Sequence, residues 1–330
     1  MSNGNYLLVA NWGGDSVPRY NGTTGAFVDV FVSRRAGRLN YPYGILFGPH
    51  DQNLYVSTGE WGGPGQLKAV LRFDGATGAF IDNFAVGGNL ESPRGIIFGP
   101  DGHLYVADRN VPTPEGRIAR FDGFTGAYLG DFVASGAGGL WQPSGLVFGP
   151  SPDNPAQLDL YIASGARRSV LRYDGTTGEF RGAFVTRGSG GLGHALGLTF
   201  GPDGNLYVAS GTFGDTNAEA VFRYQGPSSG APAAFLDIFV PPGSGGLRLP
   251  FGLVFGPDGN DDGHFDLYVA NSDATGSSLR GKKANVKRYD GVTGAFIDTF
   301  VPARSGGINE AAFLTFTSTD PVTLEYNGTQ

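Results

Sequence analysis

One pattern of apolar and polar positions recurs along the whole chain, and residues 200–210 show it most clearly. An apolar segment ends at Phe200, the polar sequence Gly-Pro-Asp-Gly-Asn follows, and the apolar run Leu-Tyr-Val-Ala begins at Leu206. Pro202 presets its own φ and Gly204 can adopt a positive φ, so the polar segment suits a tight turn. The flanking segments are short, apolar and β-prone. The pattern therefore predicts two β-strands joined by a turn.

The Leu-Tyr-Val-Ala strand has six related copies at intervals of roughly 46 to 61 residues, the range of propeller repeats. The copies begin at Leu7, Leu54, Leu104, Leu160, Leu206 and Leu267. Each copy contains four strand-like segments, which in the second copy are residues 54–57, 70–73, 79–84 and 95–98. Four strands per repeat is the pattern of one blade of a β-propeller.

The two ends of the chain complement each other. The first copy begins at Leu7 without the Gly-Leu-x-Phe strand that precedes the other copies, whereas residues 313–316 near the C-terminus are a spare strand of this kind. Pairing the two closes the ring and leaves no free edge there. We therefore predict an all-β, six-bladed β-propeller with four antiparallel strands per blade and a closing blade shared between the termini. Residues 1–330 form one domain, with an N-terminal extension (1–5), the propeller (6–317) and a C-terminal tail (318–330).

Composition narrows the classes of function. The 57 glycines and 13% aromatic residues suit many turns between aromatic-bearing strands, and the absence of cysteine excludes disulfides and thiolate metal sites. A net charge of -7 makes nucleic acid an unlikely partner. No apolar run approaches the ~20 residues that cross a bilayer. Met1 leads into polar residues, so no signal peptide is expected at this end, yet we expect an extracellular or periplasmic protein.

The predicted strand directions sort the loops onto two faces. The Gly-Pro-Asp-Gly and Asp-Gly-x-Thr-Gly turns lie on one face, here called the bottom face. The longer, irregular loops after Leu-Tyr-Val-Ala and before Gly-Leu-x-Phe lie on the opposite, top face. Loops on a rigid scaffold often carry binding sites, so the top face is the expected functional face.

Aromatic and cationic residues gather in the predicted top loops. All three tryptophans lie there, and so do more basic than acidic residues. Indole rings stack on sugar rings, and guanidinium groups bind carboxylate, sulfate or phosphate. The predicted ligand-binding residues are Trp12, Trp61, Trp141, Arg94, Arg109 and Arg248. The expected partner is a glycan or anionic polymer, or a protein; alternatively, these are solvated loops whose tryptophans pack under their neighbours.

Residues 258–266 resemble the first part of a calcium-binding loop, with the spacing D-x-N-x-D-G-x-x-D. The predicted calcium ligands are the side chains of Asp258, Asn260, Asp262 and Asp266 and the carbonyl of His264. The closing Glu of a helix-loop-helix site is absent, so a structural calcium ion on the bottom face is expected rather than a sensor. The insertion at 151–159 has the same length but lacks two ligands and the turn glycine. An ordinary polar turn is the alternative.

Arginine recurs in one register, each time just before Tyr or Phe. These arginines are Arg19, Arg72, Arg120, Arg172, Arg223 and Arg288. A group repeated in every blade indicates architecture, so we expect them to bond neighbouring carboxylates or carbonyls.

The chain resembles NHL-type six-bladed propellers through motifs such as residues 93–108 and Arg117–Asp122, and within that architecture it is similar to the virginiamycin B lyase-like group. The resemblance implies the fold and no single function. Enzymes of that group use histidine and acidic residues around magnesium. Here it implies His194, the sole histidine in a top loop, with acids such as Glu60. Lactonase-like propellers hold calcium near the channel mouth, where Asp108 lies; His194, Glu60 and Asp108 are thus the weak catalytic candidates.

Three functions follow from these patterns. The preferred one is a non-enzymatic binding or scaffold propeller that engages a glycan or other anionic partner on its top face. The alternative is a metal-dependent lyase or lactone hydrolase in the channel mouth. The third is self-assembly, in which residues 321–326 add a strand to the sheet of a neighbouring molecule.

Overall fold

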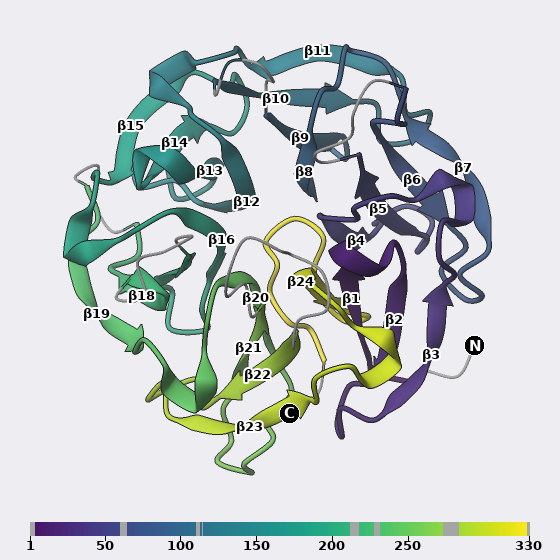
Figure 1. Ribbon diagram of the computed structural model, residues 1–330. Helices are drawn as coiled ribbons and strands as arrows, with labels where there is room; N and C mark the ends of the chain where they lie inside the picture. The colour runs from purple at the N-terminus through teal and green to yellow at the C-terminus, as the bar shows by residue number, and fades with distance from the viewer. Residues whose placement is uncertain are drawn as a thin grey trace.

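The computed structural model describes residues 4–59, 65–109, 113, 115–211, 218–227, 232–272 and 284–328. Six antiparallel sheets of four strands each stand around a central axis (Figure 1). This arrangement confirms the all-β, six-bladed propeller. The helices of the described residues are short 3-10 turns on the loops. None of them is long and apolar enough to cross a membrane.

In blades two to six the strands follow chain order outward from the axis, and in blade one the C-terminal strand is the innermost. Blade one consists of β24 (Ala311–Phe316), β1 (Tyr6–Asn11), β2 (Val17–Asn21) and β3 (Phe27–Val32). Blade two consists of β4 (Ile45–Phe47), β5 (Leu54–Thr58), β6 (Ala69–Phe73) and β7 (Phe80–Ala85). Blade three consists of β8 (Pro93–Phe98), β9 (Leu104–Arg109), β10 (Gly116–Phe121) and β11 (Tyr128–Val133).

The remaining blades follow the same order. Blade four consists of β12 (Pro143–Pro150), β13 (Leu158–Ser164), β14 (Ser169–Asp174) and β15 (Phe180–Val185). Blade five consists of β16 (Ala195–Phe200), β17 (Leu206–Ser210), β18 (Ala220–Tyr224) and β19 (Phe235–Val240). Blade six consists of β20 (Pro250–Gly256), β21 (Asp266–Asn271), β22 (Asn285–Tyr289) and β23 (Phe296–Val301).

Short 3-10 turns lie on the top face, the face seen in Figure 1. They are η1 (Trp12–Gly14), η2 (Ala36–Arg38), η3 (Ala137–Gly139), η4 (Gly165–Arg167), η5 (Ser189–Gly191), η7 (Ser244–Gly246) and η8 (Ser305–Gly307).

The ring closes as predicted, because β1 pairs with β24 in antiparallel register. Side-chain contacts between blades also join the two ends of the ring. In five blades an outer-strand phenylalanine lies directly on the middle glycine of the 3-10 turn of the preceding blade, and a Cβ on Gly37 would come within 2.1 Å of Phe80. Phe27 makes the same contact on Gly306, between blade six and blade one. The termini are therefore joined by the contact that joins neighbouring blades.

The repeated arginines form ion pairs with aspartates of their own blades. The pairs within 4.0 Å are Arg19–Asp29, Arg72–Asp82, Arg120–Asp101, Arg172–Asp159, Arg223–Asp237 and Arg288–Asp298. Their predicted architectural role agrees with this arrangement.

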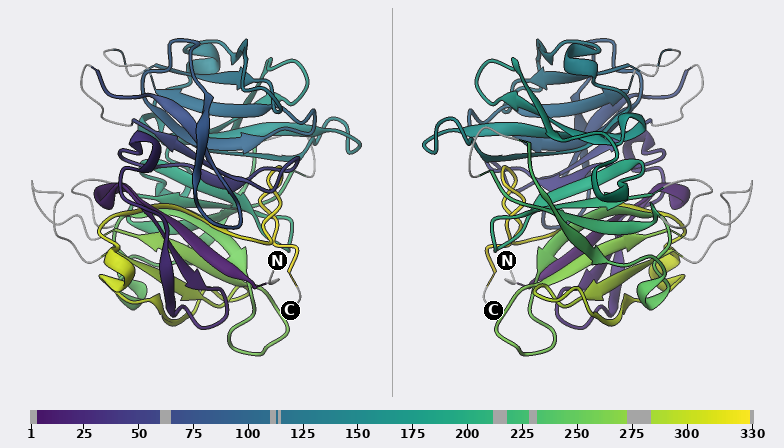
Figure 2. Two further views of the ribbon diagram at one scale, coloured as in Figure 1. Left: turned by 90° about the vertical axis from the view of Figure 1, so that its right-hand side faces the viewer. Right: turned by 90° about the vertical axis from the view of Figure 1, so that its left-hand side faces the viewer.

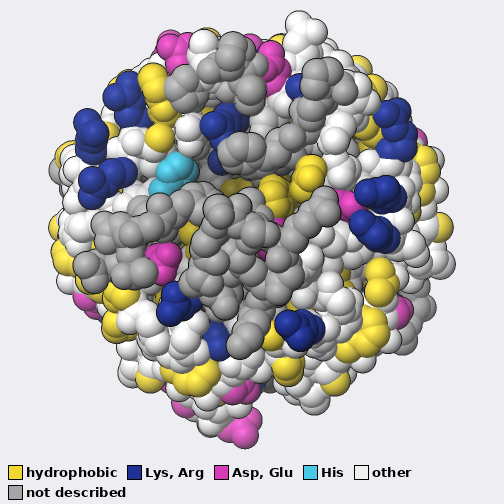
Figure 3. All heavy atoms as spheres, viewed as in Figure 1, with side chains coloured by type: hydrophobic (Ala, Val, Ile, Leu, Met, Phe, Trp, Pro, Cys, Tyr) yellow, Lys and Arg dark blue, Asp and Glu magenta, His cyan; other side chains and the backbone are white. Residues whose placement is uncertain are grey.

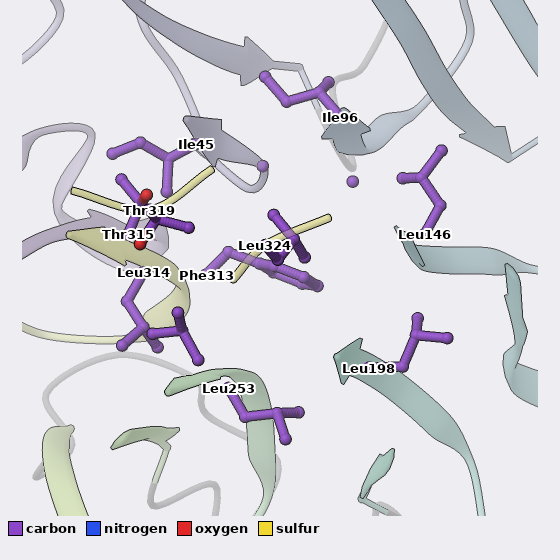
Figure 4. Close-up of a pocket in the computed structure, with 13 residues that line it drawn as sticks. Ile45, Ile96, Leu146, Leu198, Leu253, Phe313, Leu314, Thr315, Thr319 and Leu324 are labelled. Carbon is purple, nitrogen blue, oxygen red and sulfur yellow. The ribbon is translucent and has the colours of Figure 1, made fainter. Parts of the chain in front are cut away.

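The central channel is apolar. Each blade contributes one aliphatic side chain to it from the innermost strand, and all six are at most 6% exposed. They are Ile45, Ile96, Leu146, Leu198, Leu253 and Leu314 (Figure 4). A ring of this composition does not bind charged groups, so polar chemistry belongs to the ends of the channel.

The C-terminal segment 318–328 crosses the bottom face, opposite η2 and η8 (Figure 2). The N–H of Phe98 donates to the carbonyl of Pro321 (3.0 Å), and Tyr326 packs against Phe265 and Phe316. Leu324 lines the channel (Figure 4). The segment predicted to add a strand to a neighbour is thus folded against its own ring.

The tail reuses the turn chemistry of the blades. Asp320 Oδ1 accepts the backbone N–H groups of Val322 and Thr323, as Asp74 does for its own turn. The residue after the threonine of each turn has a positive φ. It is Gly78 in blade two, with φ 71°, and Leu324 in the tail, with φ 60°. A leucine in this left-handed conformation costs of order 1 kcal/mol, and burial of its side chain in the channel offsets that cost.

Candidate functional site

The candidate site lies at the top end of the channel, where the innermost strands begin. Its floor is aromatic: the ring centroid of Tyr43 is 5.1 Å from that of Phe313 and 6.2 Å from that of Phe251. The Tyr43 hydroxyl and Ser144 Oγ are 2.7 Å apart, which fixes the tyrosine across the axis. The floor separates the apolar channel from the top face.

Phe313 belongs to the floor because it breaks the repeat. Five blades have glycine immediately before the aliphatic channel residue, as in Gly44-Ile45 and Gly252-Leu253, and blade one has Phe313 before Leu314. A Cβ on Gly252 would lie 2.8 Å from the Cα of Phe313, so the neighbouring blade must supply glycine there. Sequence analysis missed the floor, although aligning this column would have shown that Phe313 replaces glycine.

Two arginines lie above the floor. The Arg94 guanidinium carbon is 5.4 Å from the ring centroid of Tyr43, and Arg94 is only 5% exposed. Its carbonyl accepts a hydrogen bond from Ser57 Oγ (2.6 Å), which fixes the backbone at the start of β8. Arg109, at the end of β9, is half-buried. Both were predicted to bind a ligand, and they lie in the same electrostatic neighbourhood, as their common effect on His194 shows.

His194 stands beside these arginines, before β16. Burial is the main reason that the pKa of its imidazole is lowered to about 4, and the charges of Arg94 and Arg109 contribute to the same shift. The ring rests on Gly165, where a Cβ would lie 2.3 Å from Nε2. Neither ring nitrogen has a hydrogen-bond partner among the described residues. Figure 3 shows Lys and Arg side chains distributed over the top face. His194 is therefore a neutral imidazole available to a ligand.

Asp108 is the second weak catalytic candidate, and its carboxylate is fully engaged. It is 1% exposed and accepts hydrogen bonds from the N–H groups of Glu91 (3.0 Å) and Ser92 (2.8 Å). Arg117 donates to its other oxygen from Nε (3.1 Å) and Nη2 (3.0 Å). Burial raises the pKa of Asp108, and these donors counter the rise. The carboxylate anchors the loop between blades two and three. Glu60, the third candidate, lies outside the described residues.

The remaining predicted ligand residues are three tryptophans and Arg248. The Trp141 ring is 4.5 Å from the guanidinium carbon of Arg167, on the rim between blades three and four. Trp12 lies 4.8 Å from Tyr41 between ring centroids, on blade one. Arg248 is exposed on the loop before β20, and its N–H donates to Asn271 Oδ1. Trp61 lies outside the described residues. Arg94 and Arg109 thus both act on His194, and Trp12 packs in the same apolar cluster as the floor residues Tyr43, Phe251 and Phe313.

The predicted calcium loop, residues 258–266, extends β20 and β21 on the bottom face. Asp258 accepts the N–H groups of Asn260 (3.1 Å) and Gly263 (2.7 Å). Asp266 is fully buried; its Oδ2 accepts the N–H of Gly259 (2.8 Å), whereas Oδ1 has no hydrogen-bond partner. Burial raises the pKa of Asp266 to about 6.

Two further oxygen-bearing residues stand beside these. Asn260 Nδ2 donates to Asp262 Oδ2 (3.2 Å) and to Asp290 Oδ2 (2.9 Å). Within the described ranges, however, no group of three or more Asp, Glu or His side chains is arranged to hold a metal ion. The loop thus offers several oxygens without the convergence of a formed site.

Known structures share the fold. The nidogen/laminin complex contains a chain that is 18% identical, with a TM-score of 0.63 and coverage of 95% of this chain and 98% of that one. A protein of unknown function from Bacteroides caccae is 14% identical, with a TM-score of 0.62 and coverage of 95% and 99%. A gluconolactonase from Xanthomonas campestris is 18% identical, with a TM-score of 0.54 and coverage of 81% and 79%.

At these identities the likeness extends to the propeller fold, which is found in both a laminin-binding complex and a lactonase. No protein-family model matches the chain. No curated protein matches it either. The fold is therefore that of a six-bladed propeller, and the resemblance to NHL-type and virginiamycin B lyase-like propellers stays a prediction.

Proposed function

We propose that this propeller is a non-enzymatic binding protein whose top face engages a glycan or another anionic partner. The arrangement of Arg94, Arg109 and neutral His194 above an aromatic floor carries the proposal. Two guanidiniums that are withdrawn from water favour a carboxylate or sulfate. The imidazole adds a donor or acceptor for a hydroxyl, and aromatic faces suit a sugar ring.

Binding tests use Arg109→Gln, which removes the less buried of the two mouth charges. Uronic-acid and sulfated oligosaccharides are expected to bind better than neutral ones, and the substitution is expected to weaken binding about tenfold or more. Binding should stay constant between pH 8 and 5.5, because the pKa of His194 is about 4 and the ring stays neutral. Isothermal titration calorimetry measures both.

The matched control is Arg181→Gln, an exposed arginine on the outer strand of blade four that pairs with Asp174. It removes the same charge far from the mouth and should leave affinity unchanged. Equal affinities for neutral and anionic sugars, or equal losses in the two variants, would contradict the proposal.

A metal-dependent lyase or lactone hydrolase is the second candidate, because a neutral imidazole without a hydrogen-bond partner among the described residues lies at the mouth and the fold also occurs in a gluconolactonase. The engaged carboxylate of Asp108 and the low pKa of His194 weigh against it, since a general base works best with a pKa near the working pH. Turnover of lactones or cyclic esters with added divalent metals, abolished in His194→Gln, would favour catalysis over binding alone.

We also propose a structural calcium ion at residues 258–266. The buried carboxylate of Asp266 is aimed into the loop by its hydrogen bond from Gly259, and its other oxygen has no hydrogen-bond partner among the residues that the structure describes. Calcium would take this oxygen together with those of Asp258, Asn260 and Asp262 and the carbonyl of His264.

Calorimetry is expected to detect calcium binding that disappears in Asp262→Ala and persists in Asp261→Asn, which removes the same charge from a position outside the ligand spacing. Bound calcium should also raise the melting temperature of the unsubstituted protein. No heat at millimolar calcium would exclude the site.

Location and assembly are proposals of the same kind. We propose an extracellular or periplasmic location, where surface glycans are accessible, and cell fractionation tests it. Self-assembly would need a contact other than pairing through residues 321–326, because these residues pack on their own ring. Light scattering of the full chain measures the oligomeric state.

A further inference from the structure

Three arginines form a ridge on the top rim of blade four. Arg167 and Arg168 follow β13 in and after η4, and Arg187 follows β15; all three are exposed. Arg168 Nε donates to the carbonyl of Leu192 (2.9 Å), and its Nη2 lies 3.5 Å from a Cβ built on Gly188, the residue after Arg187. Arg168 and Arg187 therefore share one small surface. Among the described residues, no carboxylate pairs with any of the three.

Blade one provides an internal comparison. Asp15 is the residue that follows η1, as Arg168 follows η4, and both have left-handed φ values of 53° and 57°. Asp15 pairs with Arg35 (3.3 Å) and lies 3.8 Å from Arg34, the counterpart of Arg187. Blade one thus compensates its charges, whereas blade four places a second cation where the acid would be.

The neighbouring positive charges of Arg168 and Arg187 repel each other, which disfavours the folded state. The left-handed backbone conformation of Arg168 disfavours it as well. Arg168 gains a hydrogen bond to the carbonyl of Leu192, but its charge has no carboxylate partner among the described residues. An external anion that bridges Arg168 and Arg187 would compensate both costs, as Asp15 does within blade one.

The ridge is continuous with the channel mouth. Gly165 begins η4 and carries the His194 ring on its backbone, and Arg167 at the end of the same turn lies over Trp141. Figure 3 shows several Lys and Arg side chains toward the edge of this face. An extended anion can therefore pass from the mouth over η4 to the rim.

We propose that the ridge formed by Arg167, Arg168 and Arg187 is a second subsite that binds an anionic polysaccharide extending from the channel mouth. This rests on the proposed function of the mouth and specifies its ligand as a chain with repeated carboxylate or sulfate groups. Nucleic acid, the other polyanion of this length, is distinguished from a polysaccharide by the binding test below.

Arg168→Asp tests the subsite, because it gives blade four the residue that blade one carries. The aspartate can pair with Arg187, so the variant is expected to fold with equal or higher stability. Affinity for heparin, used as a long sulfated probe, should fall about tenfold or more and become less sensitive to salt. Affinity for a sulfated disaccharide, which reaches only the mouth, should not change.

Arg109→Gln separates this proposal from the proposed function. This substitution should weaken the binding of both the sulfated disaccharide and heparin. If Arg168→Asp weakens neither, or both equally, the ridge is not a subsite, although the mouth proposal stands. If neither sugar binds the unsubstituted protein, both proposals fail. Tighter binding to single-stranded DNA than to heparin, lost in Arg168→Asp, would replace the polysaccharide with nucleic acid.

Discussion

A chain that ends at Ser318 is expected to lose about 3–5 kcal/mol of unfolding free energy, the range for removing a large buried aromatic side chain. The shortened chain lacks Tyr326, which is 7% exposed and packs between Phe265 and Phe316. It also lacks Leu324, whose side chain lines the channel. The N–H group of Phe98 also loses its acceptor at Pro321. Relief of the left-handed φ of Leu324 offsets of order 1 kcal/mol. Urea unfolding measures the difference.

Two point variants divide this effect. Tyr326→Ala should account for most of it, whereas Glu325→Ala, at the exposed neighbouring residue, should change stability by less than about 0.5 kcal/mol. The shortened chain should also bind a hydrophobic dye, because it exposes the apolar channel. An unchanged unfolding midpoint with a smaller oligomer would mean instead that the tail serves assembly between molecules.

Asp108→Ala is expected to lower the free energy of unfolding by about 3–5 kcal/mol, because it leaves the half-buried Arg117 guanidinium without the carboxylate that accepts hydrogen bonds from both its Nε and its Nη2. Two backbone N–H groups, of Glu91 and Ser92, lose their acceptor as well. Replacing both residues, as Asp108→Ala with Arg117→Met, should recover part of the loss, since the uncompensated charge is then gone. Chemical denaturation of the four proteins forms a double-mutant cycle.

Asp131→Ala is the control, because Asp131 pairs with the same arginine at 2.8 Å from a more exposed position. It should cost no more than about 1 kcal/mol. The comparison also bears on function. If Asp108 were catalytic rather than structural, Asp108→Asn would abolish a turnover shown by the unsubstituted protein while the stability remained close to normal.

Most of the fold was predictable because it is repeated. The Leu-Tyr-Val-Ala strand and its turn recur in every blade, so one interpretation applies six times, and the spare strand at 313–316 indicated how the ring closes. Local chemistry alone fixes these features: strand propensity, turn residues and the glycines that admit a neighbour's backbone. The architectural role of the repeated arginines was predictable for the same reason, because they recur in every blade.

The site was predictable only in part, because it is built from exceptions to the repeat. Arg94 and Arg109 were expected on the top face, and the structure brings them to His194. The aromatic floor was not foreseen, since Phe313 contacts Tyr43 from the neighbouring blade. Asp108 appeared available at a strand end, yet its partners come from the preceding loop and the next strand.

The sequence by itself determined the six blades, their order, the closing pair of strands and the faces on which loops lie, because periodicity and turn chemistry act over a few residues. Only the tertiary structure decided that Leu324 of the tail lines the channel and that, within the described residues, no carboxylate pairs with Arg168 where blade one has Asp15. These features depend on contacts between side chains that are far apart in the chain. A local sequence pattern does not specify which of these side chains come into contact.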